Sequence, residues 1–316
     1  MSSKYDLARS VEASLLRSHA EKNWAPSLLT VGLVYGGIWL TAHLASSFGA
    51  WSWPFALFII AAFQNHFSIL MHEAAHRLLM PSNVWNDRLG QALFAAPIVM
   101  NLKDYRYIHL KHHKFSGDPQ QDPEVAFYYG AQIGYGVQED RLKKNIINDL
   151  TGQSTIRSLI YLQKFIQERV KSGDIRAGSG EDLLCTLLGW VLLLAPAFAL
   201  GFGLHLLALW ALAFLTITPL LIRWHGVGEH TGENAETEQE KTLTHDFPFI
   251  VDFFLYPLRS GWHLEHHLFP QIPWYQMKKL RRKLLKDPSY RMEAQKLTVD
   301  GFWFGKNTVR KVVLGR

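Results

Sequence analysis

Two long stretches of the chain contain no charged residue, whereas the rest of the chain is rich in polar positions. The first stretch runs from Asn23 to His72 and the second from Leu183 to Ile222. A membrane-spanning helix needs about 20 consecutive, mostly apolar residues. Each stretch is therefore long enough for two spans joined by a tight turn.

Short breaks divide each stretch, at residues 46–51 (SSFGAW) and at residues 201–203 (GFG). They predict four spans in two hairpins, near residues 25–47, 51–71, 182–200 and 204–224. The apolar run at residues 89–100 is too short to cross a bilayer and predicts a re-entrant or interfacial helix. The alternative is a large soluble protein with buried hairpins. The absence of any charged residue from both stretches disfavours it.

The segments between and after the hairpins are polar and have helical periodicity. Residues 101–181 and 225–316 are expected to form a helical cap, in an all-α integral membrane protein with one domain over residues 1–316. Both inter-span turns lack Lys and Arg, and all 33 basic residues lie in the N-terminal arm, the central segment and the C-terminal segment. The positive-inside rule then places the cap and both termini in the cytoplasm.

Net charge and cysteine content change this picture little. The formal net charge of +6 could indicate nucleic-acid binding, but no nucleic-acid motif accompanies it, and the predicted topology accounts for the basic residues. The one cysteine, Cys185, excludes an internal disulfide and a CxxC redox pair.

Three short sequence motifs, called the histidine words, hold eight of the 15 histidines. They are HEAAH (His72 and His76), HLKHH (His109, His112 and His113) and HLEHH (His263, His266 and His267). On a helix, residues at i, i+3 and i+4 share a face, so each word projects its rings in one direction. Neutral imidazole is the commonest metal ligand, and one zinc takes only three or four ligands. The words therefore predict two metal ions close together, on the cytoplasmic side.

The identity of the metal is less constrained. Imidazole suits zinc, copper, iron and nickel. HEAAH also matches the H-E-x-x-H signature of zinc proteases, which would indicate a membrane zinc hydrolase but would leave six clustered histidines unexplained. A metal transporter would need ionisable residues at mid-span, where only His66 comes near. Iron that activates oxygen fits the whole set best.

The words HEAAH, HLKHH and HLEHH, in this order and between paired spans, resemble those of the membrane fatty acid desaturase superfamily. GDPQQDPE after HLKHH and HLFPQIPW after HLEHH add to the similarity, which covers residues 72–284. The resemblance implies a non-haem centre of two iron ions that uses O2 as co-substrate to remove hydrogen from a fatty acyl chain. Hydroxylases, ketolases and oxidative decarboxylases of the same superfamily remain alternatives.

The resemblance also implies one more histidine ligand between the last span and the third word. His230 matches that position best, and His225 is an alternative ligand or an outer partner. Two irons held by neutral rings need nearby acids that accept hydrogen bonds from the distal ring nitrogens. The candidates are Asp104, Asp118, Asp122, Glu229 and Glu265. No other catalytic side chain is predicted.

Polar residues inside the second span are candidates for lining an acyl tunnel, because intramembrane polar groups usually face a cavity or a neighbouring helix. They are Gln64, Asn65 and His66. The acyl substrate could be a free acid or be linked to CoA, a carrier protein or a membrane lipid. The sequence has no flavin, NAD or haem motif, so electrons are expected from a separate ferredoxin, rubredoxin or cytochrome b5.

Overall fold

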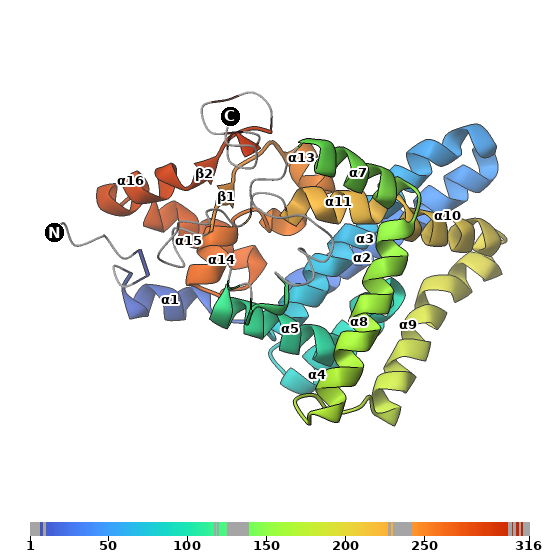
Figure 1. The fold of residues 1–316 in the computed structure, drawn as a ribbon, viewed down its shortest axis with the longest axis horizontal. Coiled ribbons are helices and arrows are strands. Elements are labelled where there is room, and N and C mark those ends of the chain that lie inside the picture. The colour runs from blue at the N-terminus through green and yellow to red at the C-terminus, as the bar shows by residue number, and fades with distance from the viewer. Residues whose placement is uncertain are drawn as a thin grey trace.

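The computed structural model describes residues 7–8, 11–116, 118, 120–124, 139–226, 229, 242–302, 305, 308–309 and 311. Over these ranges the chain is mostly helical, as expected (Figure 1). The described residues also contain one small parallel sheet, in which β1 (Thr244–His245) pairs with β2 (Thr298–Val299). This sheet ties the segment before the third histidine word to the C-terminal region.

The first hairpin consists of α2 (Trp24–Phe48) and α3 (Trp53–Ala75), joined through η1 (Ala50–Ser52). Gly49 ends α2 with a φ of 82°, a left-handed conformation that glycine adopts without a steric penalty. Both helices are long and apolar enough to cross a membrane. Helix α3 is the central one, because it packs against α2, α5, α10 and α11.

The second hairpin consists of α9 (Gly180–Ala199), α10 (Gly203–Leu215) and α11 (Ile217–Gly226). Helix α9 could span a membrane alone, whereas α10 and α11 form a pair bent by 43°. The region of the expected fourth span is thus bent, as a broken span or a re-entrant loop would be. Pro219 has no N–H to donate to the carbonyl of Leu215, which instead accepts a hydrogen bond of 3.0 Å from the Thr155 hydroxyl.

The short apolar run is more irregular than the helix expected at residues 89–100. Helix α4 (Asn83–Gly90) leads into the π-turn η2 (Gln91–Ala95) and the 3-10 turn η3 (Ala96–Ile98). These turns are buried against α3 and α9. Gly189 of α9 permits this contact, since a Cβ there would lie 2.0 Å from the carbonyl oxygen of Ala92.

The described residues outside the hairpins and the apolar run include nine further helices and turns. They are α1 (Ala13–His19), α5 (Leu102–Phe115), α7 (Glu139–Leu150), α8 (Gln153–Lys171), α13 (Phe249–Phe254), η4 (Pro257–Arg259), α14 (His263–Leu268), α15 (Trp274–Leu284) and α16 (Pro288–Lys296). In Figure 1, α1, α14, α15 and α16 gather at the left, far from the turn between α2 and α3. The hairpins and the α14–α16 region have separate hydrophobic cores.

Candidate metal centre

The three histidine words lie on three helices that meet. HEAAH occupies the end of α3, with His76 as its C-cap residue. HLKHH occupies the second half of α5, and HLEHH forms most of α14. Because each word is helical or ends a helix, its rings leave the backbone on one side.

Arg106 of α5 fixes the end of α3. Its Nε donates to the carbonyl of Ala75 and its Nη2 donates to that of Ala74, both at 2.8 Å. Asp87 of α4 accepts from the same guanidinium, with an Nη1–Oδ2 distance of 3.0 Å. Arg77 then takes a left-handed φ of 61°, and the helix stops. These contacts hold His76 against α5.

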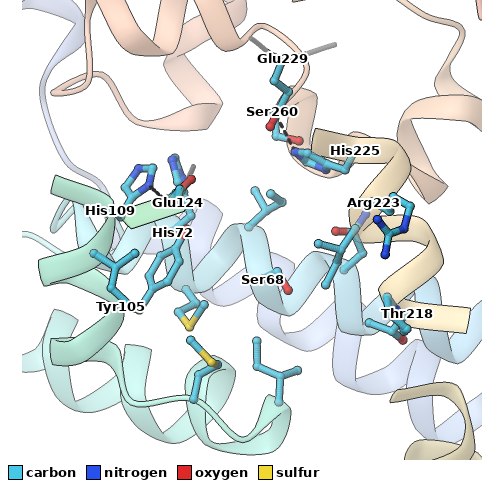
Figure 2. Close-up of a pocket in the computed structure, with 18 of the residues that line it drawn as sticks. Ser68, His72, Tyr105, His109, Glu124, Thr218, Arg223, His225, Glu229 and Ser260 are labelled. Carbon is cyan, nitrogen blue, oxygen red and sulfur yellow. Dashed lines mark hydrogen bonds and ion pairs between the residues drawn. The ribbon is translucent and has the colours of Figure 1, made fainter. Parts of the chain in front are cut away.

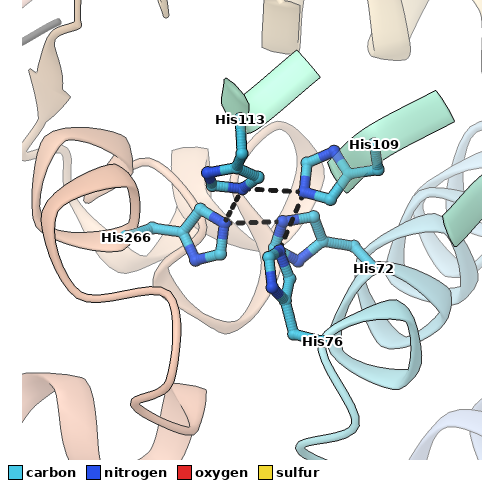
Figure 3. A group of neighbouring side chains, drawn as sticks. All are labelled: His72, His76, His109, His113 and His266. Carbon is cyan, nitrogen blue, oxygen red and sulfur yellow. Dashed lines mark hydrogen bonds between the residues drawn. The ribbon is translucent and has the colours of Figure 1, made fainter. Parts of the chain in front are cut away.

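Five histidines form the first group, the five-histidine cluster (Figure 3). They are His72, His76, His109, His113 and His266, and their ligand atoms all lie within 4.8 Å of one another. The Nε2 atoms of His109 and His76 are 2.9 Å apart, and that of His113 lies 3.0 Å from that of His266. The rings therefore point at one common centre.

The second group, the three-histidine cluster, consists of His112, His263 and His267, all buried or nearly so. It adjoins the first group, because the rings of His113 and His267 stack with centroids 4.3 Å apart. The structure thus brings all eight clustered histidines together. Each group offers enough nitrogen donors to hold one metal ion.

The buried rings of the five-histidine cluster are uncharged. Burial, followed by neighbouring rings, lowers the pKa of His109 and of His266 well below the ordinary value. The same causes lower the pKa of His113 to about 3. A metal ligand must be a neutral imidazole, so these rings are in the protonation state that binding requires.

Two acids orient rings from outside the clusters. Asp122 accepts a hydrogen bond of 2.8 Å from Nδ1 of His112, and Glu124 accepts one of 2.9 Å from Nδ1 of His109. A proton held on Nδ1 leaves the Nε2 lone pair free to face the cluster. Asp122 was a sequence candidate, whereas Glu124 was missed. Its signal was its place two residues after Asp122, in the DPE that ends GDPQQDPE.

Glu229 connects a further histidine to the three-histidine cluster. One oxygen of Glu229 lies 2.9 Å from Nε2 of His225 and 3.4 Å from Nδ1 of His263. His225 belongs to neither cluster of the described residues and contacts the three-histidine cluster through Glu229. His230, the favoured ninth ligand, lies outside the described residues.

The other three acidic candidates have different surroundings. The charged groups that act on Asp104 are Asp182 and Lys103, while burial contributes most to raising its pKa. Asp118 accepts hydrogen bonds from the backbone of Gln120 and Gln121. Glu265 accepts from Arg281 and from the Thr244 hydroxyl. These contacts are with groups other than the clustered histidines.

Comparison with known proteins identifies the family. A family model described as fatty acid desaturase matches residues 48–296. The chain belongs to the fatty acid desaturase family. It is 31% identical over 250 residues to dihydrorhizobitoxine desaturase of Bradyrhizobium elkanii, an alignment that covers 76% of this chain and 70% of the relative. It is 25% identical over 298 residues to sphingolipid delta(4)-desaturase of Schizosaccharomyces pombe, with 86% and 75% covered.

In this family member a cavity of about 340 Å³ opens beside the clusters (Figure 2). His72, His109, His263 and His266 line it, together with many apolar side chains. These apolar residues include Ile69, Ile98, Ile108, Leu159, Leu162, Phe214 and Ile222. The centre therefore faces a largely apolar space that an aliphatic chain could occupy.

The three polar residues proposed for a tunnel have different positions. Asn65 lines the cavity and donates to the carbonyl of Phe254 at 3.0 Å. Gln64 donates to the carbonyl of Trp210 at 2.8 Å and accepts from Thr218, so it ties α3 to α10 and α11. His66 bonds to the carbonyl of Ala62 at 2.8 Å and packs against Phe253. Neither Gln64 nor His66 is among the residues that line this cavity.

Proposed function

We propose that this protein is an oxygen-dependent, non-haem di-iron oxidoreductase that desaturates an aliphatic acyl chain. The observation that carries the proposal is the pair of adjoining imidazole clusters beside an apolar cavity. Membership of the desaturase family and the two relatives, both called desaturases, support it.

The number of ring ligands favours a pair of irons over a single zinc. Eight clustered histidines exceed the three or four ligands that one zinc ion takes. Imidazole is a good ligand for iron.

The five-histidine cluster would hold one iron and the three-histidine cluster the other, with His230 as a further ligand. When bound, the iron pair would use O2, two electrons and two protons to take two hydrogens from adjacent carbons, leaving a double bond and two water molecules. Asp122 and Glu124 keep the Nδ1 protons of His112 and His109 in place. The apolar cavity wall positions the chain and excludes water.

The remaining partners follow from the same proposal. A ferredoxin, a rubredoxin or cytochrome b5 supplies the electrons. The acyl group enters as a free acid or linked to CoA, a carrier protein or a lipid. The four spans and the cap form one membrane domain, with the clusters and both termini on the cytoplasmic side.

Metal and product analysis test this function. The metal content is first measured on the protein as purified. The protein is then loaded with iron in lipid nanodiscs and supplied with O2, a reduced donor and acyl substrates. Lipid profiling of an expressing host identifies these substrates. We expect about two irons per chain and a product two hydrogens lighter than the substrate. A product that gains oxygen would instead indicate a hydroxylase or ketolase, and loss of carbon dioxide a decarboxylase. About one zinc and no iron would overturn the proposal in favour of a hydrolase.

A further inference from the structure

The cavity has a second polar region, on the side of α11. Arg223 and Thr218 of α11 line the part of the cavity that lies away from His72 and His109 (Figure 2). Asp149 of α7 and Ser154 of α8 line it as well. An aliphatic chain alone would need no charged group there.

Arg223 is buried in the last turn of α11. Its residue is 4% exposed, and its partner Asp149 is fully buried. Nη2 of Arg223 donates to Asp149 at 2.8 Å, and Nε donates to the other carboxylate oxygen. Taking two charges out of water is costly, so a buried pair that lines a cavity is a candidate functional site.

One nitrogen of Arg223 has no acceptor. A guanidinium carries five N–H donors in a fixed fork, and the Asp149 side uses those on Nε and Nη2. Nη1 is buried, and no hydrogen-bond acceptor lies within reach of it in the part of the chain that the structure describes. Buried donors are rarely left unsatisfied, and because Arg223 lines the cavity, a molecule bound there can supply the acceptor.

We propose that Nη1 of Arg223 binds an uncharged oxygen at the polar end of the substrate, such as a hydroxyl, an ester carbonyl or an amide carbonyl. This inference rests on the proposed function and adds a substrate class to it. The charges of Arg223 and Asp149 balance, so a neutral oxygen satisfies Nη1 without adding charge, whereas a carboxylate would leave an unbalanced negative charge in an apolar site. The hydrocarbon then runs from Arg223 past Ser68 toward His72.

Anchoring at Arg223 also fixes the site of reaction. The distance along the cavity from Nη1 to the clusters sets which carbons reach the irons. The position of the new double bond is therefore counted from the oxygen-bearing end of the substrate. Chain length beyond the reacting carbons would not change that position.

Competitive binding to the iron-loaded protein in nanodiscs, without electron donor, tests the anchor. The probe is radiolabelled dodecanol, displaced by unlabelled dodecanol, dodecane or dodecanoate. We expect dodecanol to bind about tenfold to 100-fold more tightly than dodecane, the range for a hydrogen bond to a charged donor. Dodecanoate should bind no better than dodecanol.

The decisive variant is the double change Arg223→Met and Asp149→Leu, which leaves no unpaired charge behind. It should bind dodecane as the parent does and lose the preference for dodecanol. The matched control is Arg169→Met with Asp174→Leu, which removes a partly exposed pair, 3.2 Å apart, at the other end of α8 from Ser154. The control should keep the preference.

Several results would overturn the anchor. These are equal affinity for dodecanol and dodecane in the parent, a preference that persists in the folded double variant, or tighter binding of dodecanoate. If the double variant does not fold, Arg223→Lys decides, because it keeps the charge but loses the fork and should reduce the preference. The binding assay requires no electron transfer, so failure of the anchor can be told apart from failure of the proposed function. Iron content and product analysis test the proposed function.

Discussion

The two histidine clusters differ in how they are supported. The five-histidine cluster consists of imidazoles in mutual contact. On its outer side Glu124 accepts a hydrogen bond from His109, and Glu73 lies 3.6 Å from Nδ1 of His72. The three-histidine cluster has fewer rings, but Asp122 and Glu229 reach two of them. The first cluster offers five rings to one metal ion. The second depends more on each ring and on the acids that orient it, so the two metal positions should not be equally robust.

Removal of one ligand from each cluster should have the largest effect. We expect His266→Ala and His112→Ala to reduce turnover below detection and to lower the iron content, because both irons are needed. His266→Ala leaves four imidazoles in its cluster, and His112→Ala leaves two of the described ones. The loss of iron should therefore be greater in His112→Ala, as measured by elemental analysis.

The matched control for these two changes is His43→Ala. His43 lies near the C-terminal end of α2, a helix that carries no clustered histidine. It should retain the iron and the activity of the parent. Full activity in His112→Ala or His266→Ala would remove that residue from the site. Equal iron loss in both variants would show that the two positions are equally robust.

Loss of an orienting acid should have a smaller effect. Asp122→Asn and Glu124→Gln remove the carboxylates that accept from Nδ1 of His112 and His109. Such changes cost about tenfold to 100-fold in metal affinity or activity. Iron titration of the metal-free variants should show the greater loss for Asp122→Asn, since its cluster has fewer rings. The reverse order would contradict the comparison.

Arg106→Gln tests the support of the five-histidine cluster. The variant loses donors to the carbonyls of Ala74 and Ala75 and leaves Asp87 without its bidentate partner. We expect the free energy of unfolding to fall by about 1–3 kcal/mol. Iron bound at the adjoining cluster should show an altered Mössbauer signal. An unchanged signal in the folded variant would limit Arg106 to a role in stability.

Acidification should destabilise the metal-free protein through the five-histidine cluster. Burial and neighbouring rings lower the pKa of His109, His113 and His266, that of His113 to about 3. The unfolded chain therefore takes up protons near pH 6.5 while the folded chain does not, so stability is full above that pH and falls below it. Each such ring contributes a slope of up to about 1.4 kcal/mol per pH unit. Thermal unfolding between pH 7.5 and 4 measures this, and His113→Gln should flatten the slope.

Much of the membrane region could be predicted from the sequence. The charge-free stretches indicated two hairpins, and α2, α3 and α9 begin and end within a few residues of the expected positions. The bend at Thr216 was missed, because apolar composition does not reveal where a helix breaks. Pro219 was the available signal, and its effect depends on the hydroxyl that Thr155 supplies from a different helix.

The site was partly visible in the same way. Spacing alone put the rings of each histidine word on one face, and local sequence placed Asp122 near His112. Sequence did not separate Glu124, which orients a ring, from Asp118, which caps a turn, since both lie in one short acidic segment. Nor did it separate Asn65, which lines the cavity, from its neighbours Gln64 and His66.

The sequence by itself determined the elements and their chemistry: which stretches are apolar enough to span, and which helices carry histidines at metal-binding spacing. These properties depend on residues close together in the chain. The tertiary structure decided the division of eight rings into groups of five and three, and the meeting of Arg223 with Asp149 beside the cavity. Such contacts join distant segments, and their geometry follows from how the helices pack, which no local pattern encodes.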